Sequence, residues 1–491
     1  MSLAGVEMVF FLPVLLLLYW IGPRRIGWQN PLLLLASILF FASWTPRLLP
    51  ILAISILVDW ILGRALDAAP EDANPTPRRR LLFGTSLAFN LCLLGFFKYA
   101  GFFAASLNDL FTAMGLPPSL PVLRLVLPIG ISYWTLSKLA YVADVYWGRL
   151  RACRSLLTFA LHASFFPQLI AGPIVRGQEL LPQWSRPRHL TPSLVAGGAS
   201  AFLLGFALKA WAADWLGMAI ATPIFSEPLI YSRGARWIGL LAYAGQIFGD
   251  FAGYSFLAIG VGRFFGVELP LNFRYPFLSR SLPELWTRWH ITLNRWLFDY
   301  IYGPLTTGES FFRGRFELGF LVVFLASGLW HGAQWTFVLW GLLHGLGLVV
   351  HFRWDAFYKS RCRRDRKWVA VRRGAPYAVS AWVITQLFFV LTLIPFRTPT
   401  LAAAGEYFRL LFVRGGHVGL PIGDLESLAN FLAIAAFLLG YHVLELDRLR
   451  GLRDRVLGLP APVRGIALGL VIVFFLIFVP VGLGTFIYAE F

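Results

Sequence analysis

Long apolar stretches recur along the chain and are separated by short polar segments. The first has no basic segment before it and no small-residue cleavage site after it, so we expect a retained helix and not a cleaved signal peptide. The pattern predicts an all-α, polytopic integral membrane protein. Runs of about the length that crosses a bilayer lie near residues 8–22, 31–45, 48–63, 81–104, 193–222, 235–262, 377–396, 428–446 and 463–488.

The middle of the chain, 125–350, departs from this pattern. The segment 127–148 begins with Pro and Gly and holds Lys138 and Asp144, and 165–177 contains two prolines and two glycines. Irregular backbone at membrane depth is stable only where protein or a water-filled cavity satisfies its N–H and C=O groups, so we expect re-entrant segments that line a cavity. The predicted regions are N-terminal transmembrane helices (1–124), this core (125–350), a basic cytoplasmic loop (351–376) and C-terminal transmembrane helices (377–491).

An amphipathic helix is predicted over residues 281–300. Ser281 and Glu284 have the spacing of a capping box, and Pro283 falls in the first turn, where its missing N–H costs little. At 100° per residue the tryptophans and leucines share one arc, and most charged side chains lie opposite. His290 lies at the edge of the apolar arc, where it could orient a substrate or simply pack.

Composition and charge agree with a membrane protein. The chain has 491 residues, of which 58% are hydrophobic and 14% charged, and its net charge of +18 is gathered in short loops. This distribution marks membrane orientation and does not indicate nucleic-acid binding. Placing the basic loops in the cytoplasm puts both termini outside, joined by an even number of crossings. The basic loops are 21–27, 75–80, 149–154, 351–373 and 447–455.

Several common kinds of site have no signature in this chain. The three cysteines have no paired spacing, so neither a disulfide framework nor a metal site is predicted. The phosphate-binding loop, the serine-hydrolase elbow and the zinc-peptidase motif are missing. No repeat relates the two halves, which counts against many transporter folds.

The stretch SGLWHGAQW, 327–335, places His331 between two short apolar arms, 316–330 and 335–350. An ionisable group within the membrane is costly, and histidine is the side chain best able to exchange a proton near neutral pH, so this residue is a candidate functional group. The alternative is a buried histidine that only bonds a neighbouring carbonyl. For His344 we expect that structural role.

Seven segments carry a resemblance to a known family: FFKYAGFF (96–103), LPIGISYWTLSKLAYVADVYWG (127–148), FFPQLIAGPIVR (165–176), QIFGDFAGYSFLAIG (246–260), LNFRYPF (271–277), LWTRWHITLNRWLFDYIYGPL (285–305) and SGLWHGAQWTFVLWGLLHG (327–345). They resemble the membrane-bound O-acyltransferase family, in particular its bacterial branch that serves alginate O-acetylation. The resemblance implies a fold of about 11–13 transmembrane or re-entrant helices around a central funnel or tunnel, with 125–350 as the catalytic core. It also implies that the family's catalytic histidine falls on His331 and its other histidine on His290.

The resemblance further implies a reaction. An acetyl group would move from cytoplasmic acetyl-CoA across the inner membrane to an exported polysaccharide such as alginate or cellulose, with His331 as general base and no permanently bound cofactor. The expected partner is an extracytoplasmic acetyltransferase or carrier subunit. The expected substrate and tunnel residues are Trp289, Asn294, Trp330, Gln334, Lys138, Asp144, Arg176 and Arg288.

Three alternatives remain open from the sequence. The same fold could transfer D-alanine or acylate peptidoglycan. A proton-coupled transporter or flippase could use His331, Lys138 and Asp144 as a relay. A purely structural scaffold would tolerate loss of His331. Turnover of acetyl-CoA, or stabilisation by it, separates the enzyme from the other two classes.

Overall fold

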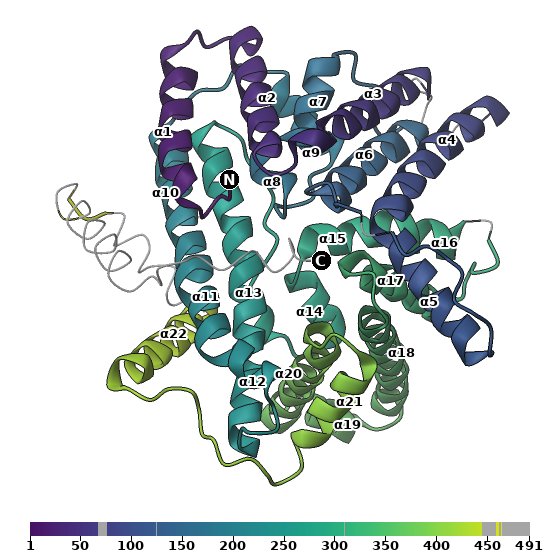
Figure 1. The fold of residues 1–491 in the computed structure, drawn as a ribbon, viewed down its shortest axis with the longest axis vertical. Coiled ribbons are helices and arrows are strands. Elements are labelled where there is room, and N and C mark those ends of the chain that lie inside the picture. Colours follow the sequence, from purple (N-terminus) through teal and green to yellow (C-terminus); the bar gives the residue numbers. More distant parts are fainter. Residues whose placement is uncertain (67–75, 124, 309, 444–457, 461–462, 464–491) are drawn as a thin grey trace. The chain divides into compact units, whose positions relative to one another are not determined.

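The structure is a computed structural model that describes residues 1–66, 76–123, 125–308, 310–443, 458–460 and 463 (Figure 1). Within these ranges most residues are helical, and the only strand-like pairing is an isolated bridge between Tyr231 and Val418. The predicted all-α class is confirmed. The apolar runs coincide with helical segments as far as Val443; residues 444–446 and the last run, 463–488 apart from Val463, lie outside the described residues.

The described part of the chain contains six helical stretches that are long and apolar enough to cross a membrane. They confirm a multi-pass integral membrane protein. The stretches are Pro46–Leu66, Pro77–Ala113, Pro192–Ser226, Trp335–Arg364, Ala375–Arg397 and Leu425–His442.

The chain forms two compact units. Among the described residues, one comprises Met1–Leu203 and Tyr254–Leu271, and the other comprises Leu204–Gly253 and the residues that follow from Asn272. The helices that begin in the first unit are α1 (Val6–Ile21), α2 (Ile26–Ala42), α3 (Leu49–Leu66), α4 (Pro77–Leu94), α5 (Ala100–Ala113), α6 (Ile131–Tyr146), α7 (Leu156–Ser164), α8 (Phe166–Leu169), α9 (Gly177–Trp184) and α10 (Pro192–Phe206).

The second unit contains the two candidate histidines, His290 and His331. A long helix, α13 (Arg233–Phe264), starts in it and continues into the first unit. Its other helices are α11 (Asp214–Leu216), α12 (Thr222–Ser226), α14 (Leu282–Arg288), α15 (Ile291–Leu297), α16 (Gly303–Thr307), α17 (Phe316–His331), α18 (Trp335–Arg364), α19 (Arg366–Arg373), α20 (Ala375–Arg397), α21 (Leu401–Leu410) and α22 (Leu425–Val443).

Helices α17 and α18 form a tightly packed hairpin in the second unit (Figure 1). Glycines allow the two backbones to approach. A Cβ atom on Gly341 would lie 2.2 Å from the carbonyl oxygen of Phe324, and one on Gly328 would lie 2.3 Å from that of Phe337. Small residues at helix crossings are a common means of close packing in membranes. The hairpin confirms the two predicted apolar arms on either side of His331.

The predicted amphipathic helix over 281–300 is wrong as a single helix. Its start is confirmed, because the Ser281 hydroxyl accepts a hydrogen bond from the backbone N–H of Glu284 at 3.3 Å. The chain then breaks at Trp289 and His290, between α14 and α15, and continues as a π-helical turn, η6 (Phe298–Tyr302). His290 adopts a left-handed conformation, with φ 45°, which an α-helix cannot contain.

The basic segment 351–376 is also helical where a loop was expected. Helix α18 continues through Arg364, and α19 follows after Asp365. The Asp365 side chain caps α19 by accepting a hydrogen bond from the Lys367 N–H at 2.8 Å. The apolar periodicity ends near residue 350, but the helix continues as a basic extension.

We expect Gly341→Ala to destabilise the second unit. The added methyl group meets the rigid backbone of α17, and overpacking of this kind costs about 1–3 kcal/mol. Thermal unfolding in detergent measures the effect as a lower midpoint. Gly405→Ala in α21 is the matched control, since a Cβ there meets no atom within 4 Å. Equal midpoints for the two variants would contradict the close crossing.

Candidate active site

His331 is the last residue of α17. The helix ends because Gly332 takes up an extended backbone, with φ −164° and ψ 149°. A Cβ on Gly332 would lie 2.1 Å from the ring of Phe337, so this glycine makes room for the side chain of the next helix. The imidazole of His331 is thereby held where the α17–α18 hairpin turns.

Aromatic rings surround the His331 imidazole, which is 4% exposed. Trp340 lies edge-to-face with it at 5.0 Å between ring centroids and 85° between planes, and Phe396 lies at 5.1 Å and 70°. The ring of Trp330 is 5.0 Å away. A proton acceptor at this position is shielded from bulk water. Polar interactions in such a buried setting are stronger than on the protein surface.

His290 is buried and held by a distant amide. Its Nδ1 lies 3.1 Å from Oδ1 of Asn272, which also accepts hydrogen bonds from the backbone N–H and the hydroxyl of Thr292, at 3.2 and 3.0 Å. Because a carbonyl oxygen only accepts, Nδ1 carries the proton. Nε2 of the neutral ring is then an acceptor, and in the described part of the chain it has no hydrogen-bond partner.

The backbone at His290 is strained, and hydrogen bonds on either side hold it in place. A left-handed conformation costs a non-glycine residue about 1–2 kcal/mol, and such positions cluster at functional sites. Two backbone hydrogen bonds hold the break in place, from Ile291 N–H to Asn272 C=O at 2.9 Å and from Arg274 N–H to Arg288 C=O at 2.8 Å.

Trp330 joins the two histidines. Its ring centroid is 5.6 Å from that of His290 and 5.0 Å from that of His331. The structure therefore brings three of the residues expected in the site into one buried cluster. The sequence reasoning missed Asn272, although it lies in the segment LNFRYPF that carried part of the family resemblance.

His344 is tied to a neighbouring helix through one ring nitrogen. It is fully buried, its Nε2 lies 2.9 Å from the hydroxyl of Thr392 on α20, and its Nδ1 has no hydrogen-bond partner in the described part of the chain. Its ring packs against Trp340 at 4.6 Å and Trp286 at 5.1 Å. These contacts link α14, α18 and α20 beneath the His331 side chain.

Three other predicted residues lie outside the histidine cluster. Trp289 is buried between Phe273 and Phe389, with centroid distances of 5.1 and 4.9 Å. Gln334 is the exposed N-cap of α18. Arg288 forms an ion pair with Glu284 of its own helix at 3.0 Å. Gln334 and Arg288 therefore lie at helix ends in this structure.

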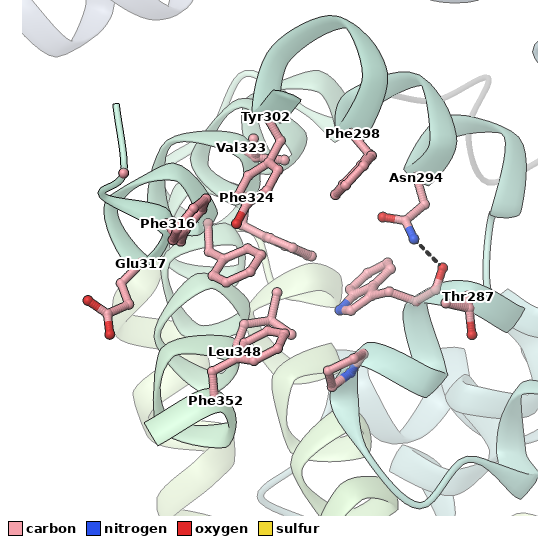
Figure 2. Close-up of a pocket in the computed structure, with 14 residues that line it drawn as sticks. Thr287, Asn294, Phe298, Tyr302, Phe316, Glu317, Val323, Phe324, Leu348 and Phe352 are labelled. Atoms are coloured by element: carbon pink, nitrogen blue, oxygen red, sulfur yellow. Dashed lines mark hydrogen bonds between the residues drawn. The ribbon is translucent and has the colours of Figure 1, made fainter. Parts of the chain in front are cut away.

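A cavity of about 690 Å³ lies within the second unit, and Figure 2 shows the side chains that line it. Asn294 lines it and donates a hydrogen bond to the backbone carbonyl of Trp286. The Trp286 ring lies 5.8 Å from that of Trp340, which in turn contacts His331. The lining residues are Pro283, Trp286, Thr287, Asn294, Phe298, Tyr302, Gly314, Phe316, Glu317, Phe320, Val323, Phe324, Leu348 and Phe352.

Lys138, Asp144 and Arg176 belong to the first unit. Lys138 is fully buried and pairs with Asp59 at 2.7 Å. The same Asp59 carboxylate accepts hydrogen bonds from Ser86 and Asn90. Arg176 is the half-buried N-cap of α9.

A second buried charge cluster escaped the sequence reasoning. Lys209 lies 2.7 Å from Asp214 and 2.6 Å from Asp250, and all three side chains are at most 5% exposed. The signal was present as charged residues within the apolar runs 193–222 and 235–262. Their pairing across helices could not be deduced from spacing along one helix.

Comparison with known proteins decides the family. The model of the membrane-bound O-acyltransferase family matches residues 124–394. The chain belongs to this family. The matched range contains every residue of the histidine cluster, so the chain is an O-acyltransferase built on the family's core.

Curated relatives resemble this O-acyltransferase over most of its length. The probable alginate O-acetylase AlgI of Azotobacter vinelandii is 36% identical over 91% of this chain and 84% of its own. The probable alginate O-acetylase AlgI of Pseudomonas aeruginosa is 34% identical over 94% of this chain and 83% of its own. The peptidoglycan O-acetyltransferase of Helicobacter pylori is 34% identical over 84% of this chain and 78% of its own.

We expect Asn272→Ala to destabilise the His290 turn. It leaves three buried donors without their acceptor, and each unsatisfied donor costs about 1–3 kcal/mol. Thr292→Val removes one donor and keeps the amide, so it should cost less. Thermal unfolding of both variants beside wild type checks the order, and an Asn272→Ala protein as stable as Thr292→Val would contradict it.

Proposed function

We propose that this O-acyltransferase moves an acetyl group from cytoplasmic acetyl-CoA across the bacterial inner membrane for O-acetylation of an exported polysaccharide. The single observation that carries the proposal is the buried cluster in which Trp330 contacts the imidazoles of both His290 and His331. Two groups able to hold or move a proton lie there in a setting closed to bulk water. Acyl transfer to a hydroxyl needs such a setting.

His331 acts as the general base. Its neutral imidazole takes the proton of the acceptor hydroxyl as the oxygen attacks the thioester carbonyl, and a positioned base contributes about 10²–10⁴ in rate. The C–S bond then breaks, and the imidazolium returns the proton to the departing CoA thiolate. The products are the acetyl ester and CoA–SH, and no acyl-enzyme forms.

His290 positions the acceptor. Its Nε2 is the acceptor end of a ring whose Nδ1–H is bound to Asn272. It can therefore receive a hydrogen bond from a substrate hydroxyl or from a group that carries one. This role follows from the fixed tautomer and differs from the proton transfer assigned to His331.

The relatives support acetyl as the group transferred. The two alginate O-acetylases and the peptidoglycan O-acetyltransferase are all named for O-acetylation. We propose that an extracytoplasmic acetyltransferase or carrier subunit accepts the group and passes it on. The proton-relay transporter is disfavoured, because all three N–H groups of the Lys138 ammonium already donate hydrogen bonds, to the Ser55 carbonyl, Asp59 and Asn90.

We expect His331→Gln to lower acetyl-CoA turnover by at least ~10², the contribution of a positioned base. His344→Gln is the matched control, since it changes a buried histidine of the same hairpin, and we expect less than a tenfold loss. Turnover is measured with purified protein in detergent, with its partner supplied, and thermal midpoints are recorded for each variant.

Two outcomes would count against this assignment. Unchanged turnover in a stable His331→Gln protein would remove the residue from the chemistry. If acetyl-CoA is neither turned over by wild type nor raises its thermal midpoint, the donor assignment falls and the transporter becomes the better reading.

Trp340 is our candidate for the group that stabilises the oxyanion. Its ring contacts His331 at 5.0 Å, and in the described part of the chain its buried indole N–H has no hydrogen-bond acceptor. A donor that gains its partner only when the thioester carbonyl becomes an oxyanion would favour the transition state over the ground state.

We therefore expect Trp340→Phe to lower kcat by about 10²–10³ with little change in KM, because the ring is kept and only the N–H is lost. Trp382→Phe is the control, since that indole already donates to the Phe277 carbonyl at 2.8 Å. Steady-state kinetics measure kcat and KM for both variants. A loss confined to KM would assign Trp340 to substrate binding instead.

A further inference from the structure

The cavity beside the histidine cluster has a continuous apolar wall. Four rings stack along it, from Phe298 to Tyr302 at 5.2 Å, Tyr302 to Phe320 at 4.8 Å, and Phe320 to Phe352 at 4.9 Å between centroids. The planes of each pair are within 24° of parallel. The rings come from η6, α17 and α18, so the wall joins the turn after α15 to the His331 hairpin (Figure 2).

One part of the cavity rim is apolar and exposed. Phe298 is 56% exposed and Phe316 is 54% exposed, although both line the cavity. Contiguous exposed apolar side chains mark contact with lipid or with a partner. An opening with such a rim suits access from the hydrocarbon of the bilayer.

The cavity has polar groups at its rim and in its interior. At the rim Glu317 pairs with Nε of Arg353 at 2.6 Å, and Arg353 is 71% exposed at its side chain, so its terminal nitrogens can bind a phosphate. Inside, the indole N–H of Trp286 has no acceptor among the described residues. An ester carbonyl would supply one.

We propose that the cavity binds one acyl chain of a membrane phospholipid, whose phosphate is held by Arg353. The apolar wall suits a hydrocarbon chain, whereas the amides of a pantetheine arm or the hydroxyls of a sugar polymer would lose their hydrogen bonds to water along it. The basic extension of α18 beyond Arg353, with Arg361, Arg363 and Arg364, favours an anionic headgroup nearby.

The bound chain connects the bilayer to the catalytic hairpin. Trp286 and Phe324 line the cavity and both contact His344, and Trp286 also contacts Trp340. The lipid thus supports the packing of His344 and Trp340, the second of which contacts His331. This site is separate from the acetyl donor and acceptor and goes beyond the proposed acetyl transfer.

The test uses the full-length protein in vesicles that contain phosphatidylglycerol with a diazirine on one acyl chain. After illumination, the labelled peptides are identified by mass spectrometry. We expect labels to concentrate within 316–324 and around Leu348 and Phe352. Labels spread evenly over the membrane-facing helices of wild type would overturn the proposal, and this result needs no variant.

Val323→Phe fills the cavity, because Val323 is a buried lining residue. We expect it to reduce labelling of 316–324 at least fivefold. Leu318→Phe on the same helix is the control, since Leu318 is 39% exposed and does not line the cavity. Equal labelling of the two variants would overturn the proposal.

The phosphate contact is tested with Arg353→Gln and with two probes. We expect this variant to weaken labelling by the phosphatidylglycerol probe and to leave labelling by a diazirine diacylglycerol, which has no phosphate, unchanged. If the diacylglycerol labels wild type as strongly as the phospholipid, the headgroup assignment is wrong. All arms are repeated without acetyl-CoA and in His331→Gln, so their result does not depend on the acetyl-transfer proposal.

Discussion

The close crossing of α17 and α18 determines where the His331 imidazole lies. Gly328 and Gly341 let the two backbones touch, and α17 can then end at His331 with the Phe337 ring packed over Gly332. If the helices stood further apart, Trp340 of α18 would not reach the imidazole. The surroundings of the candidate base therefore depend on a backbone contact made about one turn away from it.

A second constraint is that polar side chains in an apolar protein must find partners within it. Lys138 and Lys209 are each buried beside aspartates, and these pairs serve the packing of their own units. His290 differs, because Asn272 binds one ring nitrogen and the other has no partner among the described residues. A buried polar atom that lacks a partner is where a substrate can supply one.

Much of the fold could be predicted because hydrophobic length and helix-start chemistry are local. The apolar arms around His331 and the start of α14 at Ser281 are of this kind. The break at His290 could not be predicted, since it depends on a hydrogen bond to Asn272, 18 residues away. The partner of Lys138 is 79 residues away at Asp59, which helical spacing cannot reveal. Gln334 was placed in the site by proximity to His331, but the turn carries it to the surface.

The account depends most directly on where the acetyl donor binds relative to His331. A cryo-electron microscopy structure of the protein with a non-hydrolysable analogue of acetyl-CoA measures this. We expect the analogue's acetyl carbonyl in the cluster of Trp330, His331 and Trp340, with room for an acceptor hydroxyl about 3–3.5 Å from the carbonyl carbon and within hydrogen-bond reach of the imidazole. An analogue bound with its acetyl group outside this cluster would contradict the assignment of His331 as the base.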